Sequence, residues 1–220
     1  MRSTCVVVGA GRGIGLELAK LFRQTHAVTA TSRRPSSALD ALEVDNVSGV
    51  DVCDRASLSA VAGRFDASTI DLLVVVPGVL HRDTFGSIDD SQVQAQLDVN
   101  ALGPLRVVEA FSDRLRDGAK VVVLTSRMGS MADNTSGGYY GYRMSKAALN
   151  AAAVSLAHDL RHRNIAVGIL HPGFVQTDMT GGAGDLSPAE SAALLVTRIS
   201  ELSVAQSGKF FHANGENLPW

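Results

Sequence analysis

The chain has 220 residues, of which 45% are hydrophobic and 19% charged, and its formal net charge is −2. A chain of this size and composition suits one globular domain, residues 1–220, that needs no metal or disulfide for stability. The near-neutral charge excludes a basic surface for nucleic acid, and no apolar run approaches the roughly 18 residues of a membrane span. We therefore expect small-molecule partners, with no nucleic acid and no membrane.

The cysteines and the first residues predict the compartment. Cys5 and Cys53 fall in or beside predicted strands, so we expect two buried thiols in a reducing environment. The first residues lead directly into a strand and leave no space for the apolar region of a signal peptide. These features favour a cytoplasmic protein.

Short β-branched runs alternate with helical patterns along the whole chain. The predicted strands are Thr4–Val8, Ala27–Thr31, Val47–Val52, Ile70–Val76, Ala119–Thr125, Ile165–Leu170 and Lys209–His212. The predicted helices are Gly13–Gln24, Asp54–Phe65, Asp89–Leu115, Tyr139–Arg161 and Ser187–Leu202. Because the strands are apolar throughout and separated by helices, the pattern predicts an α/β protein with a doubly wound parallel sheet of about seven strands. In this Rossmann fold, helices cover both faces of the sheet.

Residues suited to ligand binding follow six of the predicted strands. In chain order they are the glycines after Val8, Arg33 and Arg34, Asp51, Pro77-Gly78, Ser126, and His171-Pro172-Gly173. Ligands of open α/β sheets bind outside the carboxyl ends of the strands. The pattern therefore predicts a ligand cleft along one edge of the sheet.

The glycine-rich sequence Gly9-Ala10-Gly11-Arg12-Gly13-Ile14-Gly15 joins the first strand to the first helix. Glycines permit positive φ angles and let backbone amides approach a pyrophosphate, which the helix N-terminus also attracts. We predict that Gly9, Gly11, Arg12, Gly13, Ile14 and Gly15 bind a dinucleotide. The spacing differs from the G-x-G-x-x-G fingerprint, and a glycine-rich turn without a ligand is the alternative.

The second strand leads into Ser32-Arg33-Arg34, in the region where an NAD site usually carries Asp or Glu. Guanidinium groups bind phosphate through paired hydrogen bonds, and Ser32 adds a hydroxyl donor. Arg12 adds positive charge on the same side. The sequence therefore predicts that NADP(H) is the preferred cofactor, with NAD(H) as the alternative. For Arg33 and Arg34, a solvated turn without a ligand is the other interpretation.

Tyr142 and Lys146 lie four residues apart in a predicted helix, which places both side chains on one face. An ammonium near a phenol favours the phenolate, so Lys146 should lower the pKa of Tyr142 from about 10. A phenol tuned in this way can give a proton to a carbonyl oxygen or take one from a hydroxyl. Tyr139 and Tyr140 lie close by, but only Tyr142 has a lysine four residues later.

Several motifs, in this order, resemble those of the short-chain dehydrogenase/reductase family. They are Gly9-x-x-x-Gly13-Ile14-Gly15, Asp51-Val52, Asn100, Ser126, Tyr142-x-x-x-Lys146 and Pro172-Gly173-x-x-x-Thr177. The resemblance extends from Cys5 to about Trp220. The tail from Gly208 onward is similar to that of short carbonyl-reductase-like and C-factor-like members of the family.

The resemblance implies a catalytic set of four residues. Tyr142 would be the general acid/base, and Lys146 would lower its pKa and hold the nicotinamide ribose. Ser126 would orient the substrate oxygen and stabilise charge that develops on it. Asn100 would hold a water that links Lys146 to solvent.

The resemblance also implies cofactor contacts beyond the glycine-rich sequence. Asp51 and Val52 would contact the adenine, and Thr177 and the backbone near Pro172 would bind the nicotinamide carboxamide. Besides Tyr142 and Lys146, the later part of the cofactor set consists of Gly78, Pro172, Gly173, Val175 and Thr177. A short substrate lid is implied at about residues 174–188, and its glycines should make it mobile. A homodimer or homotetramer is also implied.

Two positions depart from the family pattern. Val75-Val76-Pro77-Gly78 stands where the family usually has Asn-Asn-Ala-Gly, and Val8 replaces the usual Thr before the first glycine. Both amides are lost, and Pro77 removes a backbone donor. We expect these changes to alter the packing beneath the adenosine half of the cofactor and to weaken cofactor binding.

Together these features predict an NADP(H)-dependent oxidoreductase that interconverts an aldehyde or ketone with an alcohol. We expect no metal: His158 and His162 have the spacing of zinc ligands on a helix, but no third ligand is evident. Two alternatives remain. One is a nucleotide-sensing or C-factor-like signalling protein with little turnover, and the other is an NAD-dependent alcohol dehydrogenase.

Overall fold

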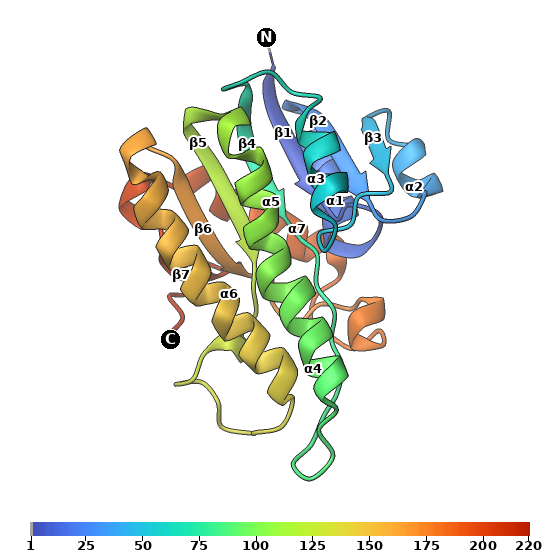
Figure 1. Cartoon of the computed structure of the whole chain (residues 1–220), viewed down its shortest axis with the longest axis vertical. Coiled ribbons are helices and arrows are strands. Elements are labelled where there is room, and N and C mark those ends of the chain that lie inside the picture. Colours follow the sequence, from blue (N-terminus) through green and yellow to red (C-terminus); the bar gives the residue numbers. More distant parts are fainter. Residues whose placement is uncertain (1) are drawn as a thin grey trace.

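A computed structural model describes residues 2–220 and contains one parallel sheet of seven strands (Figure 1). The strand order is β3-β2-β1-β4-β5-β6-β7. The strands are β1 (Ser3–Val8), β2 (His26–Ser32), β3 (Asp45–Ser48), β4 (Ile70–Val75), β5 (Leu115–Leu124), β6 (Ala166–His171) and β7 (Phe210–His212). The order reverses between β1 and β4, so the carboxyl ends of these two strands mark the switch point at which such sheets bind ligands.

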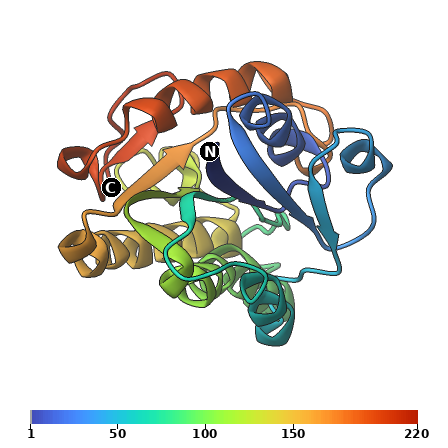
Figure 2. The same cartoon turned by 90° about the horizontal axis from the view of Figure 1, so that it is seen from above.

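Helices cover both faces of the sheet, as Figure 2 shows from above. The helices are α1 (Gly13–Phe22), α2 (Ser37–Asp40), α3 (Arg55–Ala62), α4 (Asp90–Leu97), α5 (Gly103–Phe111), α6 (Tyr140–Asp159) and α7 (Pro188–Glu201). Helices α1 and α7 lie on one face, and α3, α5 and α6 lie on the other. No helix within residues 2–220 is both long enough and apolar enough to cross a membrane.

Alternating side chains of the strands divide the core into two layers. Val6 and Val8 of β1 pack with α3, α5 and α6, whereas Cys5 and Val7 pack with α1 and α7. All four side chains are at most 1% exposed. A strand that is buried on both faces reads as a continuous apolar run, which is why the sequence predicts the sheet well. The predicted doubly wound fold is confirmed.

The prediction of one continuous helix over Asp89–Leu115 is wrong. The structure has α4, a π-helical turn at Asp98–Leu102, and α5, and β5 already begins at Leu115. Pro104 has no N–H to donate to the preceding turn, and the amide of Gly103 bonds to the carbonyl of Asp98, five residues earlier. This longer bond produces the π turn, and Asn100 lies within it.

Two predictions near the β3 edge of the sheet are also wrong. β3 begins and ends earlier than the predicted Val47–Val52, and its regular pairing stops before Gly49, whose φ is 81°. Cys53 lies beyond that turn and is exposed, whereas Cys5 is buried as expected. The sequence patterns do not predict the short helix α2.

Small residues of α6 are divided between the core and the surface. Ala153 is fully buried, whereas Ala148 and Ala151 are exposed. The expected homodimer or homotetramer therefore stays a prediction.

The start of α1 depends on close contact with the end of β1, which yields a test. A Cβ at Gly15 would lie 2.3 Å from the carbonyl oxygen of Gly9, so Gly15→Ala forces the backbone apart. We expect a loss of about 1–3 kcal/mol in the free energy of unfolding, measured by chemical denaturation. In the control Gly63→Ala the nearest such atom, a carbonyl oxygen of Ser59, is 3.3 Å away. An equal loss in both variants would contradict this account.

Candidate active site

The end of β5 and the first turns of α6 bring three polar side chains together. Ser126 follows β5, and Tyr142 and Lys146 lie one turn apart on the buried face of α6. Their exposed fractions are 8%, 8% and 3%. The hydroxyl of Ser126 lies close enough to lower the pKa of the Tyr142 phenol, and it accepts from the amide of Met128 at 3.1 Å. The structure thus brings the predicted acid, its lysine and the predicted orienting hydroxyl into one buried cluster.

Burial controls the ionisation of this cluster. It raises the pKa of Tyr142 to about 12, and the hydrogen bond with Ser126 acts in the opposite direction. Burial also lowers the pKa of Lys146 to about 8. The amine of Lys146 donates to the carbonyl of Leu124 at 3.0 Å and lies 5.8 Å from the centre of the Tyr142 ring. The expectation that Lys146 lowers the pKa of Tyr142 is therefore wrong in this structure, because desolvation of the phenol is the larger effect.

Asn100 is fully buried and holds two segments together. Its Oδ1 accepts from the amide of Val79 at 2.7 Å, and its Nδ2 donates to the carbonyl of Val79 at 2.8 Å and to Ser145 at 2.9 Å. Ser145 in turn donates to the carbonyl of Tyr142 at 2.8 Å. Both protons of the amide group are used, and Oδ1 keeps one lone pair. The predicted water at Asn100 stays a prediction.

The glycine-rich loop packs closely against its neighbours. Gly9 has a φ of 83°, and a Cβ there would lie 2.7 Å from Cγ of Pro77. Gly13 has a φ of 56°, and its Cβ would lie 3.6 Å from Cγ2 of Thr177. Ile14 is partly buried against the core layer of α1. Such a loop exposes backbone amides without side chains, which fits a group that needs close approach to the main chain.

The arginines after β2 are free to meet an anion. Arg33 and Arg34 are exposed, and neither guanidinium group has an ion-pair partner among residues 2–220. Ser32 is buried and donates to the carbonyl of Arg34 at 2.7 Å. A Cβ at Gly11 would lie 3.1 Å from the Ser32 side chain, so the turn adjoins the glycine-rich loop. The positions fit a phosphate beside the β2 terminus.

Arg12 differs from these two arginines. Its guanidinium forms an ion pair with Asp178, which lies in the segment between β6 and α7. The sequence did not predict this pair. This ion pair joins the glycine-rich loop to the segment that is predicted to be a lid.

The predicted adenine contacts follow β3 in the chain. Asp51 accepts from the amide of Cys53 at 2.9 Å, so its carboxylate caps a turn. Val52 is buried, and a Cβ at Gly103 would lie 2.7 Å from Cγ2 of Val52. Val52 therefore packs against the start of α5.

The segment after β6 is folded rather than open. Gly173 has a φ of 93°, the carbonyl of Pro172 accepts from Ser191, and Val175 is buried and pairs with Leu186. Thr177 caps a short 3-10 turn, Asp178–Thr180. These contacts hold residues 174–188 in a defined loop, and its expected mobility and lid function stay predictions.

One point beside Gly78 is shared by three side chains from separate elements. A Cβ at Gly78 would lie 3.4 Å from Oδ1 of Asn100, 3.5 Å from the methyl of Met179, and 3.6 Å from the amine of Lys146. The loop after β4 therefore adjoins the lysine of α6 and the segment after β6. The motifs did not identify Met179 or Ser145, although the spacing of Ser145, three residues after Tyr142, places both on one helix face.

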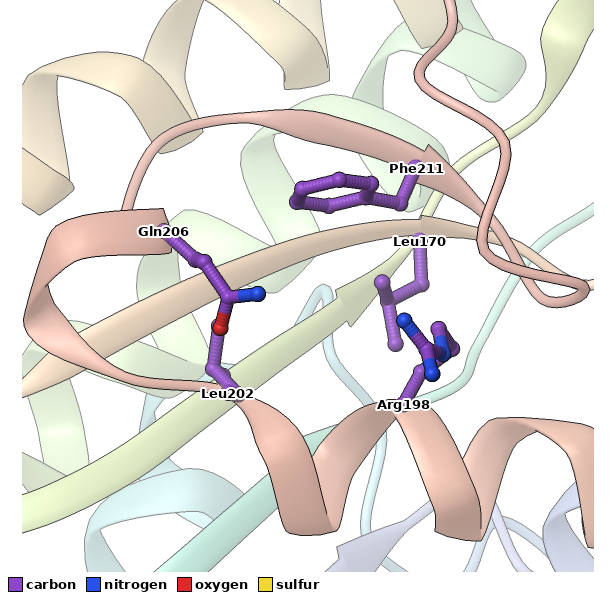
Figure 3. A pocket seen from close by; sticks show the side chains of 5 residues that line it. All are labelled: Leu170, Arg198, Leu202, Gln206 and Phe211. Carbon is purple, nitrogen blue, oxygen red and sulfur yellow. The ribbon is translucent and has the colours of Figure 1, made fainter.

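Other candidate sites carry no comparable chemistry. His158 and His162 are exposed, and residues 2–220 contain no group of three His, Cys, Asp or Glu side chains that could hold a metal. A small pocket between α7 and the strands β6 and β7 is lined by the side chains that Figure 3 labels: Leu170, Arg198, Leu202, Gln206 and Phe211. It belongs to the core layer of α7, whereas Tyr142 and Lys146 project from α6, on the other face.

Comparisons with known proteins agree with the geometry. A family model described as short chain dehydrogenase matches residues 3–186. The chain is 40% identical over 225 residues to 1-hydroxy-2-glutathionyl-2-methyl-3-butene dehydrogenase of Rhodococcus sp. (strain AD45), and the match covers 99% of this chain and 100% of that protein. It is 46% identical over 137 residues to C-signal of Myxococcus xanthus, covering 61% of this chain and 82% of that protein.

A solved structure gives the same result in three dimensions. The NADPH bound carbonyl reductase from chicken fatty liver matches 100% of this chain with 99% of its own, at 29% identity and a TM-score of 0.91. The family expected from the motifs is thereby confirmed. Since the family model covers most of the residues and both the fold and the relatives agree with it, the chain belongs to the short-chain dehydrogenase/reductase family, close to its carbonyl-reductase-like and C-factor-like members.

Proposed function

We propose that this protein is an NADP(H)-dependent oxidoreductase that interconverts an aldehyde or ketone with an alcohol, with Tyr142 as the general acid/base. The observation that carries the proposal is the buried Tyr142 phenol facing Ser126, with Lys146 one turn away. This cluster lies where the loop after β4 meets α6, on the edge that also carries the glycine-rich loop. A proton donor is thus held beside a loop suited to a dinucleotide.

The state of the phenol favours the reductive direction. A pKa of about 12 keeps Tyr142 protonated at neutral pH, so the phenol has a proton to give to a carbonyl oxygen. Ser126 donates a hydrogen bond to the same oxygen and stabilises its developing negative charge. A nicotinamide cofactor, when bound, would supply the hydride for the carbonyl carbon. Oxidation of an alcohol needs the phenolate, which burial disfavours.

Lys146 and Asn100 support proton return to Tyr142. The amine of Lys146 and the free lone pair of Asn100 flank the same point beside Gly78. A water at this point would have polar partners on two sides, and it would link the buried site to solvent. We propose that this route restores the phenol proton after each turnover.

The choice of NADP(H) rests on Arg33 and Arg34. Both guanidinium groups are exposed and free of ion pairs in the described chain, and Ser32 lies beside them. The chicken carbonyl reductase, a structural neighbour, contains bound NADPH. A ribose phosphate placed here would meet two cations.

The similar proteins also support two other functions. The name of the Rhodococcus relative describes a dehydrogenase of an alcohol with a glutathionyl group, which favours oxidation. The likeness to C-signal favours a signalling protein with little turnover. Cofactor preference and turnover distinguish all three functions.

Tyr142→Phe tests the proposed acid. Because a positioned acid contributes about 100-fold to 10,000-fold, turnover with NADPH and a panel of aldehydes and ketones should fall by at least about 100-fold. Cofactor affinity, measured by fluorescence titration, should stay within about twofold, since the ring is retained. Tyr140→Phe, on the first turn of α6, is the matched control. Full activity of Tyr142→Phe, or no activity of the natural protein on any carbonyl, would overturn the proposed function.

Arg33→Asp tests the cofactor. The substitution removes a guanidinium that would bind the ribose phosphate and places a negative charge beside that negative group. The Kd for NADPH should therefore rise about 10-fold to 100-fold, and the Kd for NADH should stay unchanged or fall. Arg161→Asp makes the same charge change at an exposed position near the end of α6 and should alter neither Kd. Tighter binding of NADH than of NADPH by the natural protein would contradict the assignment.

Lys146→Met tests the cost of the buried cation. The pKa of Lys146 falls from 10.5 to about 8, so below pH 8 the folded protein carries a buried charge that costs about 3 kcal/mol. Between pH 8 and 10.5 the unfolded chain binds more protons than the folded one, and the cost disappears as pH rises. The variant should therefore gain about 1–3 kcal/mol in the free energy of unfolding at pH 7 and nothing above pH 10.5.

The control for this pH dependence is Lys20→Met: the Lys20 side chain is 41% exposed, and its amine pairs with Glu17. It should show no comparable gain at pH 7. A Lys146→Met variant that is less stable at pH 7 than the natural protein would show that the cation stabilises the fold.

A further inference from the structure

The start of α6 is held by a carboxylate from another part of the chain. Asp83 lies in the loop between β4 and α4. Its Oδ1 accepts from the amide of Tyr140, and its Oδ2 accepts from the amide of Gly141 at 3.0 Å. Its backbone carbonyl accepts from the amide of Tyr139, also at 3.0 Å. One residue thus binds three successive amides at the entrance to the helix.

α6 has no local substitute for this cap. Tyr139 is in the left-handed conformation, with a φ of 53°, and its side chain makes no capping bond. The first turn of α6 contains no acidic residue. The first amides of a helix have no partner within the helix, and a negative charge beside them is favourable. Asp83 supplies both the acceptors and the charge.

The loop that carries Asp83 is itself anchored to α4 and the π turn. Gln96 is fully buried, and its Oε1 accepts from the amide of His81 at 2.9 Å. Asn100 holds Val79 through two hydrogen bonds. The loop is therefore held at Val79 and at His81, just before the chain reaches Asp83.

α4 and α6 also approach closely at the capped turn. A Cβ at Gly141 would lie 2.5 Å from Nε2 of Gln96 and 3.1 Å from Cγ2 of Val93. Gly141 directly precedes Tyr142. The first turn of α6 cannot move toward α4 without a steric clash, and the two oxygens of Asp83 hold its backbone amides from the loop side.

We propose that Asp83 is a positioning residue for the proposed reaction, on which this inference rests: it ties the loop after β4 to the first turn of α6 and so sets the place of the Tyr142 hydroxyl. Tyr142 is the third residue of α6, so the capped turn carries the acid directly. The same loop contains Gly78, beside Lys146. One carboxylate therefore fixes the acid relative to the loop that adjoins its lysine.

The proposed role predicts a loss of rate beyond a loss of stability. A displacement of about 1 Å in a reacting group can reduce the rate about 100-fold. Asp83→Ala should lower kcat for carbonyl reduction about 10-fold to 100-fold, with the Kd for NADPH within about twofold. Asp83→Asn keeps one acceptor oxygen and should recover part of this rate. Hydrogen exchange at Tyr140 and Gly141 should be faster in Asp83→Ala.

The matched control is Asp89→Ala. Asp89 caps α4 through two backbone amides, those of Ser91 at 2.9 Å and Gln92 at 3.3 Å, and lies outside the catalytic set. Its removal should lower the thermal midpoint by an amount similar to that of Asp83→Ala while kcat stays within about twofold.

The outcomes separate this inference from the proposed function. If the natural protein reduces carbonyls and Asp83→Ala keeps its full kcat, or if Asp89→Ala loses kcat equally, the positioning role is overturned and the proposed function stands. If the natural protein reduces no carbonyl, the proposed function itself fails. In that case faster exchange at Tyr140 and Gly141 would still identify Asp83 as the cap of α6.

Discussion

The burial of Tyr142 and Lys146 against the carboxyl ends of the strands is the constraint on which the site depends. The same removal from water raises the pKa of the phenol and lowers that of the amine, so it moves both groups toward their neutral forms. A protein that only needed stability would avoid an amine in this place. The arrangement is useful when a proton must be held on the phenol until a carbonyl oxygen accepts it.

Much of the surrounding structure holds that buried pair in place. Lys146 donates to the last strand carbonyl of β5, at Leu124, and Ser145 links the backbone of Tyr142 to Asn100. Asn100 lies in a π turn, a feature that is frequent at functional sites. From this turn, one amide side chain contacts both the loop after β4 and α6.

Local pattern explains what the sequence could predict, and long-range contact explains what it could not. The strands and α6 follow from apolar runs and from the spacing of Tyr142 and Lys146, which are local properties. The cap by Asp83 joins residues 57 and 58 positions apart. The pKa of Tyr142 depends on how deeply the folded chain buries it. The spacing correctly placed the amine near the ring, but it could not show that desolvation is the larger effect.

The two departures from the family pattern are connected in space. Val8 replaces the usual Thr and Val75 the first usual Asn, and the register of the sheet pairs Val8 of β1 directly with Val75 of β4. Both side chains are 1% exposed and pack in the same core layer. The apolar contact is not matched on the other side of β1, where Thr31 of β2 pairs with Val8 and its buried hydroxyl has no hydrogen-bond partner in the described chain. Pro77 then places its ring against Gly9, where a side chain at position 9 would clash. The β4 side of the switch point therefore supports the glycine-rich loop through apolar contact, whereas on the β2 side the amides of Gly9 and Ala10 donate to the carbonyl of Thr31 at 3.1 and 2.7 Å.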